Sequence, residues 1–330
     1  MANGRIQSRS CVAGISRWLR ECPLLFFRRH ASLVLGGFRS PLIRYSLLVA
    51  GLSAACARPP RRTAADIDDF GDTIRLSARP TRIVSLNPTT TELIFALGAG
   101  SRLVGRTEYD SWPDSAKLVP NLGAGLRPNV EAILGARPDL VVLYASQDNR
   151  AAAAQLKKAG ITTISLKIDS IGSFRAAVSK LGLVLGDTVR ARIVRDSVSA
   201  TLQRVASATA NLPRPTVFWH VWDAPIITIG RGSFLNELVE IAGARNAYAD
   251  ISQPSPTVSL EDISRRNPDF ILIGSLGAQR LRSDPRWKIV RAVRADDLLV
   301  VDTNLVGRPS VRLGEAAVAL ARLLHPGAVR

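Results

Sequence analysis

The sequence predicts an α/β fold with two Rossmann-like lobes, each built on a mostly parallel sheet, joined by one long rigid helix. The first observation is a segment that occurs twice, at residues 129–143 and 259–273. Both copies read Glu, any residue, Ile, four further residues, Pro-Asp and an apolar run. Each copy predicts a short helix that ends near the Pro and leads into a buried strand. Helix, Pro-Asp and strand is common in α/β proteins, but here the Glu also recurs in register, which favours two similar lobes.

Two further observations support this fold. Strand-like and helix-like segments alternate through most of the chain, as expected for a parallel sheet. Between the two copies lies a long stretch with apolar residues at helical spacing and no strand. The length of 330 residues fits two domains of ordinary size, and 46% hydrophobic with 22% charged residues is a globular composition.

Residues 1–56 are predicted to be a leader and signal peptide, with a true start that lies downstream of Met1. Arg44 precedes a short apolar core at 45–55, which ends in small residues and Cys56. This ending resembles a bacterial lipoprotein signal, in which Cys56 becomes the lipidated first residue. The alternative is simple cleavage and release. We expect export to the periplasm or the outer face of the cell membrane, and a flexible tether at 57–72.

The charge of the chain is strongly positive but unevenly placed. The net charge is +17, and residues 1–56 hold eight Arg and one acidic residue. The remaining basic residues are scattered and match no nucleic-acid-binding motif, so we expect no nucleic-acid partner. All three Cys lie in the leader (Cys11, Cys22 and Cys56), which excludes a disulfide framework or Cys-based metal site from the body. After residue 60, no apolar run reaches the ~20 residues that a membrane span needs.

The first lobe is assigned to residues 73–170. It opens with a β-rich run at 82–86, followed by a helix that Thr89 or Thr90 would cap and Gly98 would end. The turn between them presents backbone N–H groups, and such helix N-termini attract anions. The later elements are strands at 102–107, 140–144 and 161–166 and helices at 129–136 and 151–159, with a loop at 108–113.

A helical connector is assigned to residues 171–212. Phe174, Val178, Leu181 and Leu185 form one apolar stripe, and the pattern restarts at Asp187. A helix over 187–210 would be about 36 Å long at ~1.5 Å per residue. Such a stiff connection predicts little movement of the lobes on binding.

The second lobe is assigned to residues 213–330. Its first strand, 216–222, is crowded with aromatic residues. A Gly-rich turn at 230–233 caps the next helix. The other expected elements are strands at 226–229, 270–274 and 298–301, helices at 234–242, 287–293 and 310–324 besides the second repeat helix, and loops at 250–257 and 302–309.

The sequence carries no recognisable catalytic motif. His220 and His325 are the two His after the leader, and neither has a spacing partner for zinc. Nucleophile-elbow, dinucleotide and phosphate-loop motifs are absent. Glu131 and Glu261 could form an acid/base pair, but each begins a surface helix. We therefore expect no enzyme activity, no catalytic residue, no resident cofactor and no metal site. An envelope hydrolase that uses this carboxylate pair and a purely structural envelope protein remain as alternatives.

Aromatic residues are the best candidates for ligand contacts. Tyr109 and Trp112 lie in a predicted loop, and Tyr144 ends a strand. His220 and Trp222 share one face of the strand 216–222. Core packing is the simpler interpretation for each aromatic alone, but their recurrence at strand ends favours a flat or ring-shaped ligand.

The chain resembles the periplasmic binding proteins of ABC importers for cobalamin and ferric siderophores. The likeness covers about residues 80–325 and rests on Arg-Ile-Val-Ser-Leu-Asn-Pro-Thr-Thr-Thr-Glu-Leu, Leu-Val-Gly-Arg-Thr-Glu-Tyr, Pro-Asn-Val-Glu-Ala-Ile and Arg-Pro-Asp-Leu-Val. It implies a monomer that holds a metal chelate between its lobes and delivers it to a permease that works with an ATPase. It also implies that Glu131 and Glu261 dock onto the permease.

Cobalamin or a related corrinoid is the favoured ligand, and a ferric siderophore or haem is the alternative. The resemblance adds Tyr109, Tyr144 and Trp222 as contacts for a corrinoid. Three positions depart from the cobalamin pattern: Gly125 and Ser255, where Trp is common, and Asn304, where an acid is common. The complete predicted ligand set is Thr89, Thr90, Tyr109, Trp112, Tyr144, His220, Trp222, Arg231 and Arg308, the two Arg being suited to anionic groups.

Overall fold

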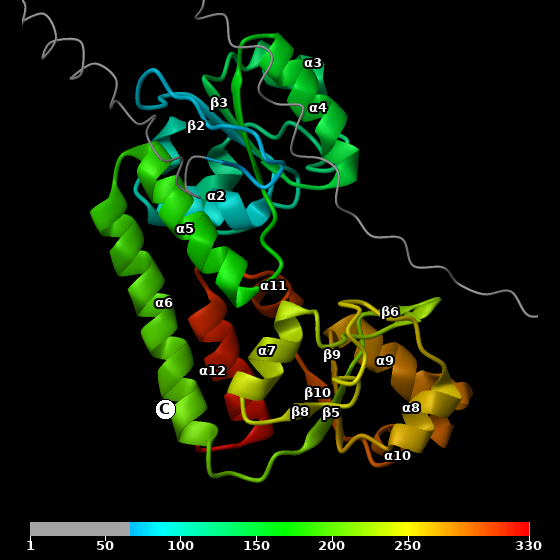
Figure 1. The fold of residues 1–330 in the computed structure, drawn as a ribbon. Helices are drawn as coiled ribbons and strands as arrows, with labels where there is room; N and C mark the ends of the chain where they lie inside the picture. Colours follow the sequence, from blue (N-terminus) through cyan, green and yellow to red (C-terminus); the bar gives the residue numbers. More distant parts are fainter. Residues whose placement is uncertain (1–66, 330) are drawn as a thin grey trace, which may run out of the picture. The chain divides into compact units, whose positions relative to one another are not determined.

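The computed structural model describes residues 67–329. The predicted leader, Cys56 and residues 57–66 of the predicted tether lie outside this range. Within it, two lobes follow one another along the chain, each with a four-stranded parallel sheet (Figure 1). No helix in this part of the chain has the length and apolar character required to cross a bilayer.

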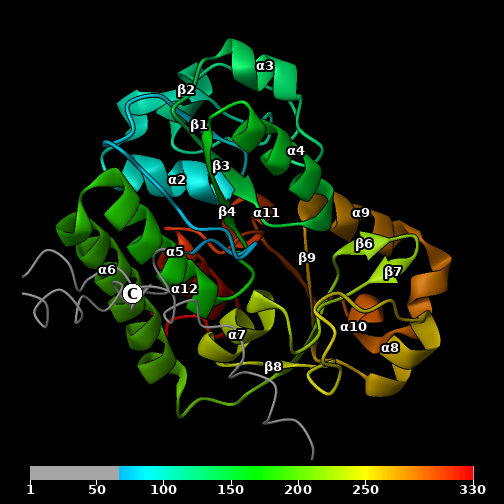
Figure 2. The ribbon, with the colours of Figure 1, turned by 45° about the horizontal axis from the view of Figure 1, so that its top comes forward.

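The sheet of the first lobe has the strand order β2-β1-β3-β4, with every neighbouring pair parallel. All four strands bury apolar side chains because helices cover the sheet (Figure 2). The strands are β1 (Ile83–Ser85), β2 (Leu103–Gly105), β3 (Leu140–Tyr144) and β4 (Thr162–Leu166). The helices are α2 (Pro88–Ala96), α3 (Val130–Gly135) and α4 (Gln147–Lys158), with short 3-10 turns η4 (Gly100–Arg102) and η5 (Asp114–Leu118).

Two helix starts in the first lobe differ from the prediction. The side chain of Asn87, not that of Thr89 or Thr90, caps α2 by accepting a 2.8 Å hydrogen bond from the Thr89 N–H. Pro88 follows at the first helical position, where its missing N–H costs nothing. Helix α4 begins four residues before Ala151, because the polar segment from Gln147 is helical and buries Asn149.

Residues 67–72 pack against the first lobe instead of forming a free tether. The Asp68 carboxylate is buried and accepts hydrogen bonds from the backbone of Phe70, Asp72 and Ser165. Asp69 accepts from the Lys167 N–H and pairs with the Lys180 ammonium at 3.2 Å. The first lobe therefore begins before residue 73.

The connector consists of α5 (Ile171–Leu185) and α6 (Thr188–Thr209), and α6 is the predicted long helix. Gly186 ends α5 in the left-handed conformation, with φ 75°, which allows the chain to reverse into α6. Figure 1 shows α6 running from beside the first lobe to the second. One apolar core continues from Ile83 through Phe174 and Leu202 to Leu320, so both lobes share a packed spine.

The sheet of the second lobe has the order β10-β9-β5-β8 and is also parallel. The predicted strand 216–222 ends at Trp219, and Trp222 lies instead in a separate hairpin. The strands are β5 (Thr216–Trp219), β8 (Arg245–Asn246), β9 (Phe270–Ile273) and β10 (Leu298–Val300), with hairpin strands β6 (Trp222–Asp223) and β7 (Ile226–Ile227).

Two helices of the second lobe were not predicted from the sequence. Helix α9 (Ser275–Ser283) is mostly polar, and α11 (Thr303–Val306) has only four residues, so neither gives a clear apolar period. The others are α7 (Phe234–Ile241), α8 (Leu260–Arg266), η6 (Pro285–Ile289), α10 (Arg291–Arg294) and α12 (Leu313–Leu324).

The repeated segment is the same structural unit in both lobes. It forms α3 and β3 in the first lobe and α8 and β9 in the second. The Asp of each Pro-Asp pair accepts a backbone hydrogen bond at the start of a neighbouring strand: Asp139 from the Thr81 N–H at 2.7 Å, and Asp269 from the Thr216 N–H at 2.8 Å. This shared hydrogen bond explains why Pro-Asp recurs.

Candidate ligand-binding cleft

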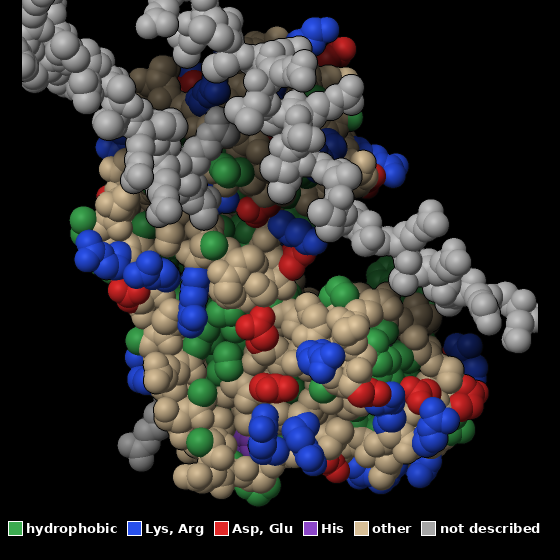
Figure 3. Space-filling view, viewed as in Figure 1, with side chains coloured by type: hydrophobic (Ala, Val, Ile, Leu, Met, Phe, Trp, Pro, Cys, Tyr) green, Lys and Arg blue, Asp and Glu red, His purple; other side chains and the backbone are tan. Residues whose placement is uncertain are grey.

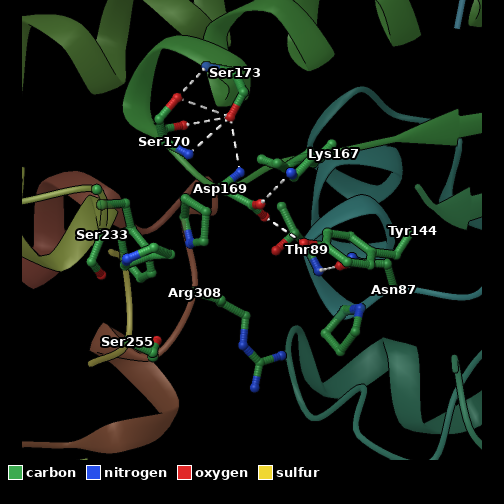
Figure 4. A pocket seen from close by; sticks show the side chains of 17 residues that line it. Asn87, Thr89, Tyr144, Lys167, Asp169, Ser170, Ser173, Ser233, Ser255 and Arg308 are labelled. Carbon is green, nitrogen blue, oxygen red and sulfur yellow. Dashed lines mark hydrogen bonds and ion pairs between the residues drawn. The ribbon is translucent and has the colours of Figure 1, made fainter. Parts of the chain in front are cut away.

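A cavity of about 790 Å³ is lined by residues of both lobes. One side is formed by the start of α2, the end of β3 and the segment 167–173, and the other by residues 232–234, 254–255 and 307–309 (Figure 4). This size lies within the usual range for small-molecule sites. The lining is mixed: Asn, Thr, Ser, Lys, Asp and Arg side chains lie beside apolar groups such as Ile168, Phe234 and Pro309.

Three helix N-termini meet at this cavity. Asn87, Ser170 and Ser233 cap α2, α5 and α7, and all three residues line the cavity. The N-terminus of a helix carries a partial positive charge and N–H groups without helical partners. Lys167 and Arg308 add positive charges at the same lining, and Asp169 adds a negative one 3.8 Å from the Lys167 ammonium. The three helix N-termini favour a ligand that carries an anionic group.

Tyr144 and Asp169 form a polar pair in the cavity wall. The Tyr144 hydroxyl donates a 2.7 Å hydrogen bond to Asp169 Oδ1 (Figure 4). The pKa of Tyr144 is raised well above its usual value, first by burial and then by the hydrogen bond and the charge of Asp169. Tyr144 therefore stays protonated over the physiological range and acts as a hydrogen-bonded aromatic wall.

A smaller apolar cavity of about 370 Å³ adjoins the first and shares Asn87, Pro88 and Tyr144 with it. Its wall is formed by Leu86, Leu126 and the exposed ring of Tyr109. Such a surface suits the flat apolar face of a macrocycle.

The backbone of this apolar wall is fixed from behind by Asn149. The buried Asn149 amide donates to the carbonyls of Gly125 and Tyr144 and accepts from the Arg127 N–H. Gly125 lies so close to β1 that a Cβ atom would approach the Leu86 carbonyl oxygen to 2.3 Å. A Trp at this position would displace the backbone, and Gly125 leaves the cavity open.

The predicted ligand residues are divided by the structure. Thr89, Tyr144 and Arg308 line the larger cavity, and Tyr109 lines the adjoining one. Thr90 does not reach either cavity, because it is fully buried with its hydroxyl bonded to Ser85 and the Asn87 carbonyl.

Four other predicted residues lie away from these cavities. Trp112 packs its ring under the Arg312 guanidinium at 5.4 Å. His220 is buried in the second lobe with its ring edge-on to Trp287 and its Nε2 atom 2.9 Å from Asp223 Oδ1. Trp222 is 61% exposed on the β6–β7 hairpin, and Arg231 is exposed next to the cavity residue Gly232.

Several cavity residues were not predicted from the sequence: Lys167, Asp169, Ser170, Ser173 and Ser233. Two of them could have been predicted, because Ser170 and Ser233 precede helical segments at N-cap positions. Lys167 and Asp169 lie in the link between β4 and α5, and nothing in their local pattern marks a ligand site.

Glu131 and Glu261 are exposed in the first turns of α3 and α8. A hydrogen bond from its own backbone N–H and one from Ser259 lower the pKa of Glu261, so this carboxylate is charged. On the face of the second lobe that Figure 3 shows, Lys and Arg side chains lie among Asp and Glu side chains. Among residues 67–329, no group of three or more His, Cys, Asp or Glu is arranged to hold a metal ion.

Known proteins resemble this chain over most of its length. An ABC transporter substrate-binding lipoprotein of Bacillus subtilis, YvrC, itself uncharacterized, is 30% identical over 85% of this chain and 95% of its own. A cobalamin-binding protein of Halobacterium salinarum is 28% identical over 84% and 77%. The crystal structure of a periplasmic heme binding protein from Pseudomonas aeruginosa is 26% identical with a TM-score of 0.68, covering 75% of this chain and 94% of that one.

These relatives are solute-binding proteins, which confirms the predicted family resemblance and the prediction of a binding protein rather than an enzyme. A binding protein of this kind takes up a ligand and carries no resident cofactor. The hydrolase alternative is therefore set aside. Residues 83–305 match the family described as periplasmic binding protein, and this chain belongs to it.

Proposed function

We propose that this protein binds a metal chelate, with cobalamin or a related corrinoid favoured, in the cleft between its lobes and delivers it to an ABC permease. The observation that carries this proposal is the pair of adjoining cavities. The larger one, of about 790 Å³, combines polar side chains and three helix N-termini with apolar surface, and the smaller one, of about 370 Å³, is mostly apolar. Cobalamin needs both environments, since it combines a wide ring with polar amide arms and a phosphodiester.

A ferric siderophore or haem is the second candidate. It is favoured by Lys167 and Arg308, because carboxylates of such ligands pair well with cations at a partly buried site. The likeness to a heme binding protein from Pseudomonas aeruginosa also supports it.

Axial ligation weighs against haem. Haem iron in proteins is held by His, Cys, Met or Tyr side chains. Among the residues that line the two cavities, Tyr109 and Tyr144 are the side chains of this kind. The pKa of each is raised, that of Tyr109 by Glu108 and that of Tyr144 by burial and Asp169, which opposes formation of the phenolate that would bind iron. A corrinoid, whose cobalt can bring its own axial ligands, avoids this difficulty.

We further propose that Glu131 and Glu261 dock onto the permease, which works with its ATPase subunits, and that the protein acts as a monomer. The exposed positions of both carboxylates on equivalent helices of the two lobes support this docking. Lipidation of Cys56 after export is proposed from the signal sequence, and the lipoprotein relative in Bacillus subtilis supports it. A Cys56→Ala variant should then leave the membrane fraction, whereas retention there would contradict lipidation.

The test is calorimetric titration of the purified protein with cyanocobalamin, haemin and a ferric hydroxamate siderophore. We expect tight one-to-one binding of cyanocobalamin. Tyr109→Ala should weaken it about tenfold, the effect of losing ~1.4 kcal/mol from an aromatic contact. Leu118→Ala is the matched control, because Leu118 is 86% exposed and lines neither cavity. If only an iron chelate binds, the ligand is an iron chelate and not a corrinoid. If none of the probes binds, the proposal is refuted.

A further inference from the structure

A buried carboxylate lies behind the cationic part of the cleft. Glu92, on α2 of the first lobe, is 2% exposed. Its Oε1 atom lies 3.7 Å from Nη1 of Arg308, which comes from the second lobe. Within residues 67–329, neither Glu92 Oε2 nor Arg308 Nη1 has a hydrogen-bond partner. Two oppositely charged groups from different lobes thus face each other under the cavity without a close hydrogen bond.

This arrangement is unfavourable for stability taken alone. Burial raises the pKa of Glu92, and the charge of Asp110 raises it further. A hydrogen bond with the Ser310 side chain and the positive charges of Arg308 and Arg312 lower it. Two other buried oxygens, Thr91 Oγ1 and Asp110 Oδ1, have no partner at normal hydrogen-bond distance among the described residues, although Thr91 still lowers the pKa of Asp110. A partly satisfied buried polar network costs more than an apolar core of the same shape. The cluster therefore calls for a role other than holding the lobes together.

Arg308 connects this cluster to the ligand site. Its side chain is 20% exposed and lines the larger cavity. Figure 4 shows its guanidinium reaching into the space between Ser255 and Asn87. One edge of the guanidinium thus faces Glu92 and the other is available to the cavity. An Arg side chain has many rotamers, and a fixed carboxylate behind it limits them.

We infer that Glu92 is a positioning residue that holds Arg308 in place to bind an anionic oxygen group of the ligand. The inference rests on the proposed function of the cleft, and it adds Glu92 as the residue that fixes the position of the Arg308 side chain. Arg312 does not serve in this way, because it stacks on Trp112 and pairs with Glu315 at 3.0 Å. Preorganising a charged donor increases affinity by reducing the ordering cost of binding.

The experiment compares ligands with and without an anionic group. Cyanocobalamin carries a phosphodiester that dicyanocobinamide lacks, and haemin carries carboxylates that its dimethyl ester lacks. We expect Glu92→Gln to weaken binding of the member that carries the anionic group about tenfold, and binding of the member that lacks this group less than about twofold. The midpoint of thermal unfolding at pH 7 should fall, because Glu92→Gln leaves the buried edge of the Arg308 guanidinium without its countercharge. A purely structural residue would weaken both ligands equally.

Two variants act as controls. Glu240→Gln removes an exposed carboxylate of α7 that lines neither cavity, and it should leave both affinities unchanged. In an Arg308→Gln background, Glu92→Gln should have no further effect on binding of the anionic ligand. If Glu92→Gln does not fold, Glu92→Asp, which keeps the charge but shortens its reach, should give a smaller loss limited to the anionic ligand.

The outcomes separate this inference from the proposed function. If the wild-type protein binds a chelate and Glu92→Gln binds both members of the pair as the wild type does, the inference is wrong and the function stands. If no chelate binds, the function is wrong, and inorganic pyrophosphate decides the inference. Stabilisation by pyrophosphate that is lost in both Glu92→Gln and Arg308→Gln would support it, and absence of that stabilisation would overturn it.

Discussion

The hydroxyl of Tyr144 donates a 2.7 Å hydrogen bond to Asp169, and this bond joins the end of β3 to the segment that leads into α5. Tyr144 lies at the boundary of the two cavities and contributes to both. Asp169 in turn accepts this bond while its own N–H donates to Ser173 Oγ, so the link is part of a short chain of hydrogen bonds. The position of the Tyr144 ring thus depends on the hydrogen bonds of Asp169.

We predict that Tyr144→Phe weakens chelate binding by less than tenfold, whereas Tyr144→Ala weakens it further. The Phe variant keeps the ring and loses one hydrogen bond, which contributes about 0.5–1.5 kcal/mol. The Ala variant also loses the aromatic contact. Calorimetric titration with cyanocobalamin measures both. Equal losses in the two variants would show that the hydroxyl, and not the ring, makes the contact.

Gly125→Ala is predicted to lower the free energy of unfolding by about 1–3 kcal/mol and to weaken binding. The added Cβ would lie 2.3 Å from the Leu86 carbonyl oxygen, so the backbone around residue 125, which borders the smaller cavity, must move. Denaturant unfolding and calorimetry check the two effects. Gly135→Ala is the control, because it meets no atom within 4 Å and lies in α3, where Ala favours the helix. A Gly125→Ala variant as stable as the wild type would contradict the close approach.

The order of strands and helices could be predicted because local pattern decides it. Each Pro-Asp segment ends a helix and begins a strand, and the spacing of Phe174, Val178 and Leu181 identified α5. The missed helices α9 and α11 lack this signal, because one is polar and the other has a single turn. The long helix α6 was predicted because no strand-like run interrupts it.

The cleft could be predicted only in part, because its residues meet through the fold and not through sequence spacing. Thr89 and Arg308 are more than 200 residues apart and line one cavity. Trp112 and His220 belong to types that often bind ligands, yet one packs on Arg312 and the other on Trp287. Residue type alone cannot separate an aromatic residue that packs inside the protein from one that meets a ligand.

His220 predicts a loss of stability in mild acid. Its burial lowers its pKa below the ordinary value of 6.5, and this outweighs the opposite effect of Asp223. The unfolded chain therefore takes up a proton near pH 6.5 that the folded protein does not yet bind. By linkage, the stability contributed above pH 6.5 is lost as the pH falls below it. His220→Gln should flatten the dependence of the unfolding midpoint on pH between about 7.5 and 5.

The wild-type protein is measured beside the variant at each pH. Glu92 and Asp110 have raised pKa values, so their protonation acts in the opposite direction over acid pH. The difference between variant and wild type therefore isolates His220. An unchanged pH dependence in His220→Gln would contradict the prediction.

Glu131→Ala and Glu261→Ala are predicted to leave chelate affinity within about twofold of the wild type, because both carboxylates are exposed on helices outside the cleft. Each should raise about tenfold the concentration of binding protein that gives half-maximal stimulation of ATP hydrolysis, as expected for loss of one interfacial charge pair. The measurement is stimulation of ATP hydrolysis by the reconstituted transporter, at several concentrations of the loaded binding protein. Glu240→Ala, which removes an exposed carboxylate from α7, should stimulate normally. Because the two carboxylates lie on different lobes, the double variant should lose more than either single one. Normal stimulation by the double variant would show that docking uses another surface.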